Sequence, residues 1–141
     1  SLARSCNLIV TTTPATSPLI DDVQPGTHIT AMGSDTPQKQ EIDAALLGRA
    51  DLVVADSKPQ CLVRGEIARA IEAGTMTEDD VVELGDVISG SHAGRATDDA
   101  ITVADLTGVA VQDLRIAEAV YERLSQAVDP PIADSNSLSP R

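Results

Sequence analysis

Short apolar segments alternate with longer segments of helical periodicity, and this alternation restricts the possible folds more than any other feature of the chain. Runs of β-branched and other apolar residues predict four strands, at residues 7–13, 28–32, 51–56 and 101–105. Apolar residues at spacings of three and four predict helices at residues 37–50, 57–73 and 109–127, with a shorter one after Thr77. Strands that alternate with helices form a parallel sheet covered on both faces, because their crossovers are right-handed. We therefore expect an α/β fold, one half of a Rossmann-like doubly wound parallel sheet that ends in a long helix.

Local signals set the ends of several predicted elements. Ser57 and Gln60 have the spacing of a capping box at the start of one helix, and Gly74 ends that helix. Thr77 is expected to cap the short helix that follows, whose apolar residues are Val81, Val82, Leu84, Val87 and Ile88.

The predicted elements divide the chain into three parts. Residues 1–108 are expected to form a partial Rossmann-like domain, and residues 109–127 a separate helix. The Pro- and Ser-rich residues 128–141 are predicted to be a disordered tail. The chain begins with Ser rather than Met, and four strands are half of a doubly wound domain, so we expect a fragment or a processed form.

The charge of the chain limits its partners. Acidic residues number 22 against 10 basic ones, and the net charge of −12 argues against nucleic acid or an anionic membrane as a partner. No apolar run approaches the roughly 20 residues of a membrane span, and no signal peptide is visible. Cys6 and Cys61 lie in strand-like and helix-like segments, which favours a reducing cytoplasm over a disulfide. Tyr121 is the only aromatic residue, so the core must consist of Ala, Val, Ile and Leu.

Polar or glycine residues follow every predicted strand. In an open parallel sheet, ligands bind beyond the carboxyl ends of the strands, so these clusters are expected to line one crevice. The sequence contains no G-x-G-x-x-G, the phosphate-binding turn of a dinucleotide fold. The clusters are residues 11–13, 33–35, 56–57 and 105–108.

Asp35 has two interpretations. It is a candidate for proton transfer, with Lys39 four residues later neutralising it or a bound anion. It is equally a candidate helix N-cap, with Gln38 completing a capping box, and spacing alone favours the cap.

The remaining candidates have ordinary structural explanations. His28 begins a strand and is an acid–base candidate by residue type, although a single histidine there is more often structural. Cys61 lacks a neighbouring base and is interpreted as a small core residue. No metal-ligand spacing is present. Three further candidates, each with a capping or surface alternative, are Asp56 and Asp105 for ribose hydroxyls and Arg95 for a phosphate.

Several segments together resemble the carboxyl-terminal part of the ornithine cyclodeaminase/mu-crystallin family. The similarity covers about residues 7–127, and its motifs agree in order and spacing. They are Thr11-Thr12-Thr13-Pro14, residues 25–35, Pro37-Gln38-Lys39-Gln40-Glu41, Asp56-Ser57, Gly65-Glu66, Glu83-Leu84-Gly85, Gly94-Arg95 and residues 101–113.

The resemblance implies a domain that binds NAD or NADP, joined to a second domain that dimerises and helps to hold the substrate. The shared chemistry of the family is hydride exchange between nicotinamide and the α-carbon of a small amino or imino acid. Asp35 takes the place of the family's catalytic acid/base, which reverses the preference for a cap. The long helix then leads toward the dimerisation domain, and the complete protein is expected to be a homodimer.

The same resemblance implies roles for further residues. Lys39 matches a cofactor contact, Thr12 or Thr13 matches the segment beside the cofactor's ribose, and Thr107 faces the substrate. The remaining cofactor-binding positions that it implies are His28, Ile29, Thr30, Ala31 and Leu106.

Two departures from the family's pattern bear on function. Ornithine cyclodeaminases usually carry Phe-Asp-Ser where this chain has Ala104-Asp105-Leu106, and Gly where it has Gln38, which favours dehydrogenase-like activity over ornithine cyclisation. The family's substrate-carboxylate residues and glycine-rich turn belong to an amino-terminal half absent from this sequence, so the chain alone is expected to be inactive. The alternatives are a non-catalytic binding or interaction module of mu-crystallin type, and a remnant that does not fold by itself.

Overall fold

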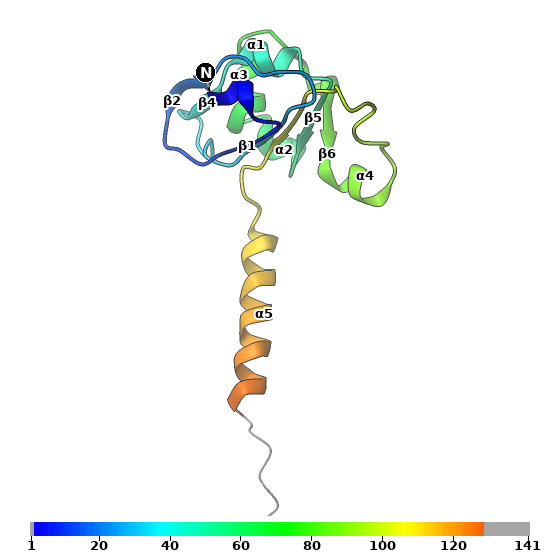
Figure 1. Ribbon diagram of the computed structural model, residues 1–141. Coiled ribbons are helices and arrows are strands. Elements are labelled where there is room, and N and C mark those ends of the chain that lie inside the picture. Colours follow the sequence, from blue (N-terminus) through cyan, green and yellow to red (C-terminus); the bar gives the residue numbers. More distant parts are fainter. Residues whose placement is uncertain (1, 129–141) are drawn as a thin grey trace, which may run out of the picture. The chain divides into compact units, whose positions relative to one another are not determined.

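The computed structural model describes residues 2–128, coloured along the chain in Figure 1. They divide at Gly108 into an α/β unit and a separate helical unit. The predicted tail from residue 129 onward lies outside the described residues, and Val128 belongs to the last helix.

A five-stranded parallel sheet organises the α/β unit and confirms the predicted fold class. Its strand order is β1-β3-β7-β5-β6. The strands are β1 (Leu8–Thr11), β3 (His28–Ala31), β5 (Leu52–Ala55), β6 (Val81–Glu83) and β7 (Thr102–Asp105). The prediction of four strands missed β6, which pairs with β5 through Val53 and Val81. Three residues are too few to reveal a period of two, and the apolar residues that follow them suggested a helix.

The predicted helix at residues 37–50 is wrong in its first half. Residues Gln40–Ile42 form β4, which pairs in parallel with β2 (Thr16–Ile20) in a small second sheet. The helix, α1, is only Ala44–Gly48, and Asp43 caps it by accepting from the Ala45 amide at 2.8 Å. No helix begins at Asp35, so its interpretation as a cap is wrong.

The single helix predicted at residues 57–73 is two helices, α2 (Lys58–Cys61) and α3 (Gly65–Glu72). Gly65, with φ +89°, turns the chain between them. Ser57 makes no side-chain cap; the Lys58 amide instead donates to Glu83 Oε1 at 2.9 Å. The predicted stop at Gly74 is confirmed, since α3 ends just before it and its φ is +72°.

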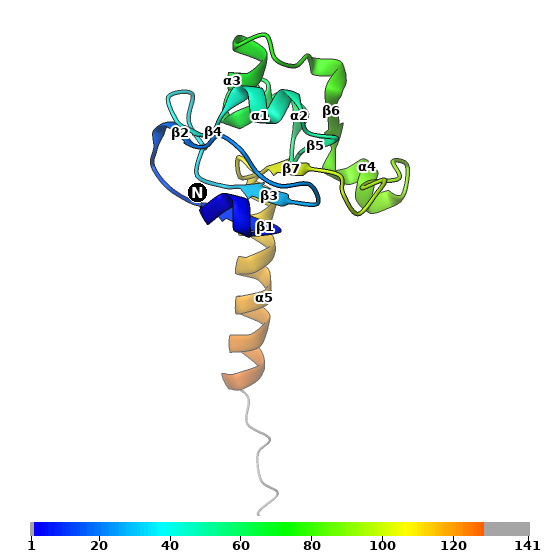
Figure 2. The same cartoon turned by 45° about the horizontal axis from the view of Figure 1, so that its top comes forward.

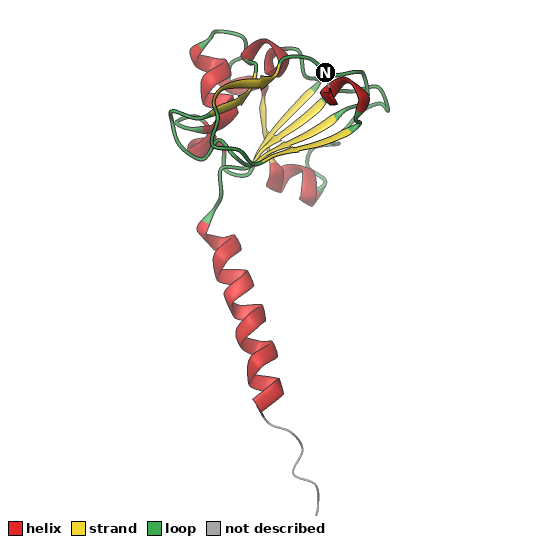
Figure 3. Cartoon of the chain, turned by 60° about the vertical axis from the view of Figure 1, so that its left-hand side comes forward, coloured by secondary structure: helices red, strands yellow, loops and turns green. Residues whose placement is uncertain are grey.

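The segment after Thr77 is a short 3-10 turn, Glu78–Asp80, that leads into β6 and then α4 (Leu84–Ser89). Helices lie on both sides of the sheet (Figure 3). Residues Ile9, Ile29, Val103, Val53 and Val81 stand in one row across the strands.

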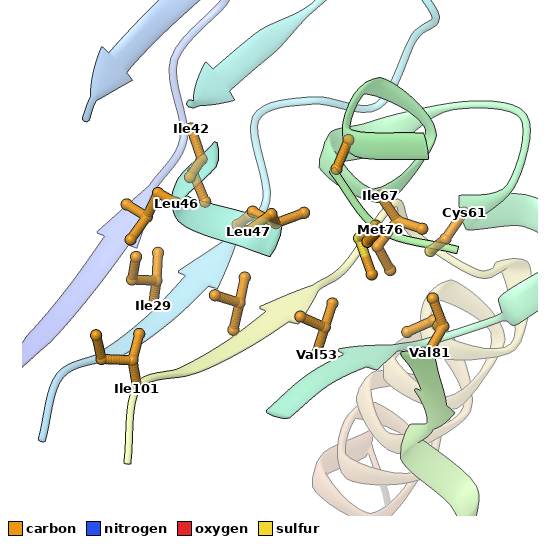
Figure 4. Close-up of a cluster of buried hydrophobic side chains, with 14 of the residues drawn as sticks. Ile29, Ile42, Leu46, Leu47, Val53, Cys61, Ile67, Met76, Val81 and Ile101 are labelled. Carbon is orange, nitrogen blue, oxygen red and sulfur yellow. The ribbon is translucent and has the colours of Figure 1, made fainter. Parts of the chain in front are cut away.

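That row faces α1, α2 and α3, which lie together on one side of the sheet (Figure 2). Figure 4 shows aliphatic side chains from the sheet and the helices meeting there, without an aromatic ring. The opposite face is open at β1, where Leu8 and Val10 are 66% and 56% exposed. The sheet is therefore covered on one face and only partly on the other, and β1 is an edge strand.

The helical unit consists of α5 (Ala110–Val128), which agrees with the predicted long helix. Its apolar side chains are exposed, among them Leu114, Val120, Tyr121 and Leu124. Among residues 2–128, no helix combines the length and the apolar character that a membrane crossing requires.

Candidate cofactor and substrate site

The carboxyl ends of the strands meet at one edge of the sheet, as predicted. Thr11, Ala31, Asp105 and Ala55 stand in register across β1, β3, β7 and β5. The residue after each strand continues the ladder: the Met32 amide donates to Thr11 O at 2.9 Å, and the Leu106 amide to Ala31 O at 2.8 Å. The loops that follow these strands therefore start side by side.

Asp35 and Lys39 pair in the loop after β3. Lys39 Nζ lies 2.6 Å from Asp35 Oδ1, and the Asp35 side chain is 54% exposed. The hydrogen bond from Lys39 holds the pKa of Asp35 below its ordinary value. Asp35 is thus an exposed carboxylate beside a cation at the carboxyl edge of the sheet.

The proposed cofactor residues of β3 point in two directions. Ile29 and Ala31 are buried under the helices, so only their main chain is available to a ligand. His28 begins β3, at the strand end remote from the site, and its Nδ1 lies 2.7 Å from Thr102 Oγ1. Burial lowers the pKa of His28, with a smaller contribution from the positive charge of Arg95. Thr30 Oγ1 lies 3.2 Å from His28 Nε2, on the same face.

The turn after β7 is held by Asp56 and Gln60. Asp56 Oδ2 accepts from the Gly108 amide at 2.9 Å, and Oδ1 accepts from Thr107 Oγ1 at 3.2 Å. Gln60 Nε2 donates to Thr107 Oγ1 at 2.7 Å. Through these hydrogen bonds Asp56 fixes this turn rather than capping α2. Within the turn, Thr107 is buried and Leu106 is half-buried.

Three buried carboxylates lie behind this edge, and sequence reasoning assigned no role to two of them. Glu41, Glu66 and Asp105 are each at most 1% exposed. Burial raises the pKa of Asp105 to about 7, and burial also raises the pKa of Glu66. The only signal in the sequence was that Glu41 and Glu66 belong to the motifs that carry the family resemblance.

The remaining candidates are structural. Cys61 is fully buried, and burial raises its pKa to about 12, so its thiol is not a nucleophile. Arg95 donates to the carbonyls of Thr97, Asp98 and Ala100, which fixes its own loop. Both cysteines are free. Residues 2–128 contain no cluster of side chains suited to a metal ion.

The edge suits one end of a nicotinamide dinucleotide. Thr12 is exposed and Thr13 half-buried, so both are open to a ligand at this edge, and Lys39 supplies a cation. Thr11 Oγ1, at the end of β1, is buried without a hydrogen-bond partner among the described residues. A glycine-rich turn for the pyrophosphate is absent from the sequence. The residues therefore fit the nicotinamide and ribose end of the cofactor.

Comparisons with known proteins show the family of the chain. A sequence model of the ornithine cyclodeaminase/mu-crystallin family matches residues 2–127. The uncharacterized cyclodeaminase y4tK of Sinorhizobium fredii is 46% identical over 123 residues, which are 85% of this chain and 37% of that protein.

Two solved structures resemble the fold closely. An archaeal alanine dehydrogenase dimer with bound NAD has a TM-score of 0.81 at 41% identity, over 91% of this chain and 42% of that one. The iminosuccinate reductase of Paracoccus denitrificans, in complex with NAD+, has a TM-score of 0.83 at 43% identity, over 89% and 39%. The chain spans about two fifths of the length of these relatives.

Proposed function

Because the chain belongs to the ornithine cyclodeaminase/mu-crystallin family, we propose that it is the carboxyl-terminal part of an NAD(P)-dependent oxidoreductase that acts on a small amino or imino acid. The observation that carries the proposal is the Asp35–Lys39 pair at the carboxyl edge of the sheet. Relatives at 41% and 43% identity, an alanine dehydrogenase and an iminosuccinate reductase, have structures with bound NAD and NAD+.

In the complete site, Asp35 holds and moves a proton. Its carboxylate is exposed and is kept ionised by Lys39, so it can take a proton from an amino or imino nitrogen or from water and later return it. When bound at this site, NAD(P) would supply the hydride exchange at the α-carbon of the substrate. The turn that carries Thr107, whose own hydroxyl is bonded to Asp56 and Gln60, faces the substrate.

The cofactor is held by groups on the strand-end loops. Thr12 and Thr13 would hold its ribose, Lys39 would supply a positive charge, and Leu106 would line the nicotinamide side. The main chain of β3, at Ile29 and Ala31, would line the nicotinamide, and the side chains of His28 and Thr30 support that strand.

Ornithine is not the favoured substrate. Ala104 and Leu106 flank Asp105 where ornithine cyclodeaminases usually carry Phe and Ser, so amino-acid dehydrogenase or imine reductase activity is favoured. The exposed apolar side chains of α5 pack on the second domain of a longer, homodimeric protein. We expect residues 1–141 alone to be inactive, because they contain no glycine-rich turn for the cofactor.

Titration of the chain with NADH and NADPH, followed by nicotinamide fluorescence, tests cofactor binding. With no Trp in the chain the optical background is low. We expect saturable enhancement, and Lys39→Ala should weaken binding about tenfold or more because a charge-assisted contact is lost. Arg69→Ala is the matched control, since it removes one cation whose partner is the exposed Glu72.

Equal affinities of the two variants would contradict the role of Lys39. Absence of any enhancement, with a folded circular dichroism spectrum, would instead support the alternative function, a non-catalytic interaction module of mu-crystallin type.

The role of Asp35 is tested by measuring turnover in a longer protein that includes the remainder of the domain. We expect Asp35→Asn to lower kcat roughly 100-fold or more, the usual contribution of general acid–base catalysis. Asp79→Asn, which neutralises an exposed carboxylate in the 3-10 turn, should leave kcat unchanged. Wild-type turnover in the Asp35→Asn protein would remove the proposed role.

A further inference from the structure

We propose that Glu41 is a positioning residue whose buried carboxylate fixes the loop carrying Thr12 and Thr13 against the loop carrying Asp35. The inference of a role in the reaction rests on the proposed function, but the contacts themselves do not. Glu41 Oε1 accepts from the Thr13 amide at 2.6 Å, and Oε2 accepts from the Gly33 amide at 3.0 Å. One side chain thus joins the segments that leave β1 and β3.

The charge of Glu41 is balanced by these amides. Glu41 is completely buried, and none of the ion pairs among residues 2–128 includes it. A buried carboxylate without a cation depends on hydrogen bonds to its charged form, and such bonds are shorter and stronger than neutral ones. Separation of the two loops would leave the charge unsatisfied, so Glu41 favours a single arrangement of both.

The two loops approach Glu41 too closely for a side chain at position 33. A Cβ on Gly33 would lie 2.5 Å from Glu41 Cδ and 2.5 Å from Thr13 O. Glycine at this position therefore permits both hydrogen bonds, and the contact has no room to adjust.

We call the two hydrogen bonds that Glu41 accepts from Thr13 and Gly33 the clamp. The clamp is connected to Asp35 through the main chain. The Asp35 amide donates to Gly33 O at 3.1 Å, and Ser34 Oγ donates to Lys39 O at 2.8 Å. The loop that holds the Asp35–Lys39 pair is thereby closed on the residue that Glu41 binds. Because the Glu41 side chain bonds both loops, it sets the distance between this loop and the loop that carries Thr12 and Thr13.

The main chain at Glu41 is held in turn by Glu66. Glu66 accepts from the Glu41 and Ile42 amides at 2.8 and 3.1 Å. Next to Glu66, the Ile67 amide donates to Asp105 Oδ2 at 2.9 Å. Asp105, Glu66 and Glu41 therefore form a series of carboxylate-to-amide contacts that links the end of β7 to the ends of β3 and β1.

Residue-resolved amide hydrogen exchange, measured by NMR on the full chain, tests this role without cofactor. Glu41→Gln keeps the shape, but its amide oxygen can accept from only one of the two N–H groups. We expect exchange to accelerate about tenfold or more, as for loss of a hydrogen bond to a charged group, at whichever of Thr13 and Gly33 loses its acceptor and at Asp35 in the adjoining loop. Val103, in the centre of the sheet, should exchange at the wild-type rate.

A purely structural role predicts a different pattern, in which Val103 and the loops accelerate together. That pattern, or unchanged exchange at Thr13 and Gly33, would overturn the proposal. Glu72→Gln is the matched control, because it removes an equal charge from an exposed side chain of α3. It should leave all four amides unchanged.

A second variant covers the case in which Glu41→Gln does not fold. Glu41→Asp keeps the charge with a side chain one methylene shorter, so it can reach one of the two amides. We expect slow exchange to survive at Thr13 or at Gly33 and to be lost at the other, and retention at both would overturn the clamp.

NADH titration of the same variants connects the clamp to the proposed function. Weaker binding in Glu41→Gln, with Val103 exchange unchanged, supports positioning of the cofactor loops. If the wild-type chain does not bind NADH, the proposed function fails on its own, while the exchange rates still decide whether Glu41 joins the loops.

Discussion

Gly65→Ala is expected to lower the free energy of unfolding by about 3–5 kcal/mol, because two separate costs add. The backbone of Gly65 has φ +89°, where a side chain is strained. A Cβ there would also lie 2.5 Å from Asp105 Oδ2 and 2.7 Å from Thr107 Cγ2. The substitution forces α3 away from Asp105 and breaks the contact from the Ile67 amide. Urea unfolding followed by circular dichroism measures the loss.

Gly74→Ala separates the two costs. Its φ is +72°, but no atom lies within 4 Å of the added Cβ, so only the backbone strain remains. We expect this control to lose about 1–2 kcal/mol. If Gly65→Ala were no less stable than Gly74→Ala, the close approach of α3 to Asp105 would be wrong.

The parallel sheet and the edge where its carboxyl ends meet followed from the alternation of the sequence, since both depend on patterns several residues long. The break between α2 and α3 could not be predicted from the sequence. Glycine is required at position 65 because the Asp105 carboxylate lies close to it, and Asp105 is 40 residues away in the sequence. Residues 37–50 misled for a similar reason. The Glu41 and Ile42 amides bond to Glu66, 25 and 24 residues away, and this contact overrides the local helical spacing.

In the candidate site too, local pairs could be predicted from the sequence and contacts between distant residues could not. Asp35 and Lys39 are four residues apart, and their pairing was foreseen although the helix expected to carry them is absent. Buried Glu41 and Glu66 could not be assigned, because acidic residues are usually exposed and their partners here are backbone amides. A sequence does not display which amides a fold leaves free.

The contribution of Asp105 to the stability of the chain should fall as the pH rises from about 4 to about 7. Burial raises its pKa from 3.8 to about 7, so the folded state binds a proton more tightly than the unfolded state. The stabilising contribution is complete below pH 3.8 and is lost as the pH passes through 7. At 1.36 kcal/mol per pKa unit, the full loss is up to about 4 kcal/mol.

Asp105→Asn isolates this contribution, because the amide oxygen can still accept from Ile67 while the group no longer ionises. We expect the variant to equal the wild type within about 1 kcal/mol at pH 4 and to exceed it by up to about 4 kcal/mol at pH 8. The lowered pKa of His28 gives a slope of opposite sign in this range, and it cancels in the comparison of the two proteins. Urea unfolding at each pH measures the difference. If the difference instead stays constant with pH, Asp105 is ionised over the whole range. The series of Asp105, Glu66 and Glu41 would then carry a negative charge that burial disfavours.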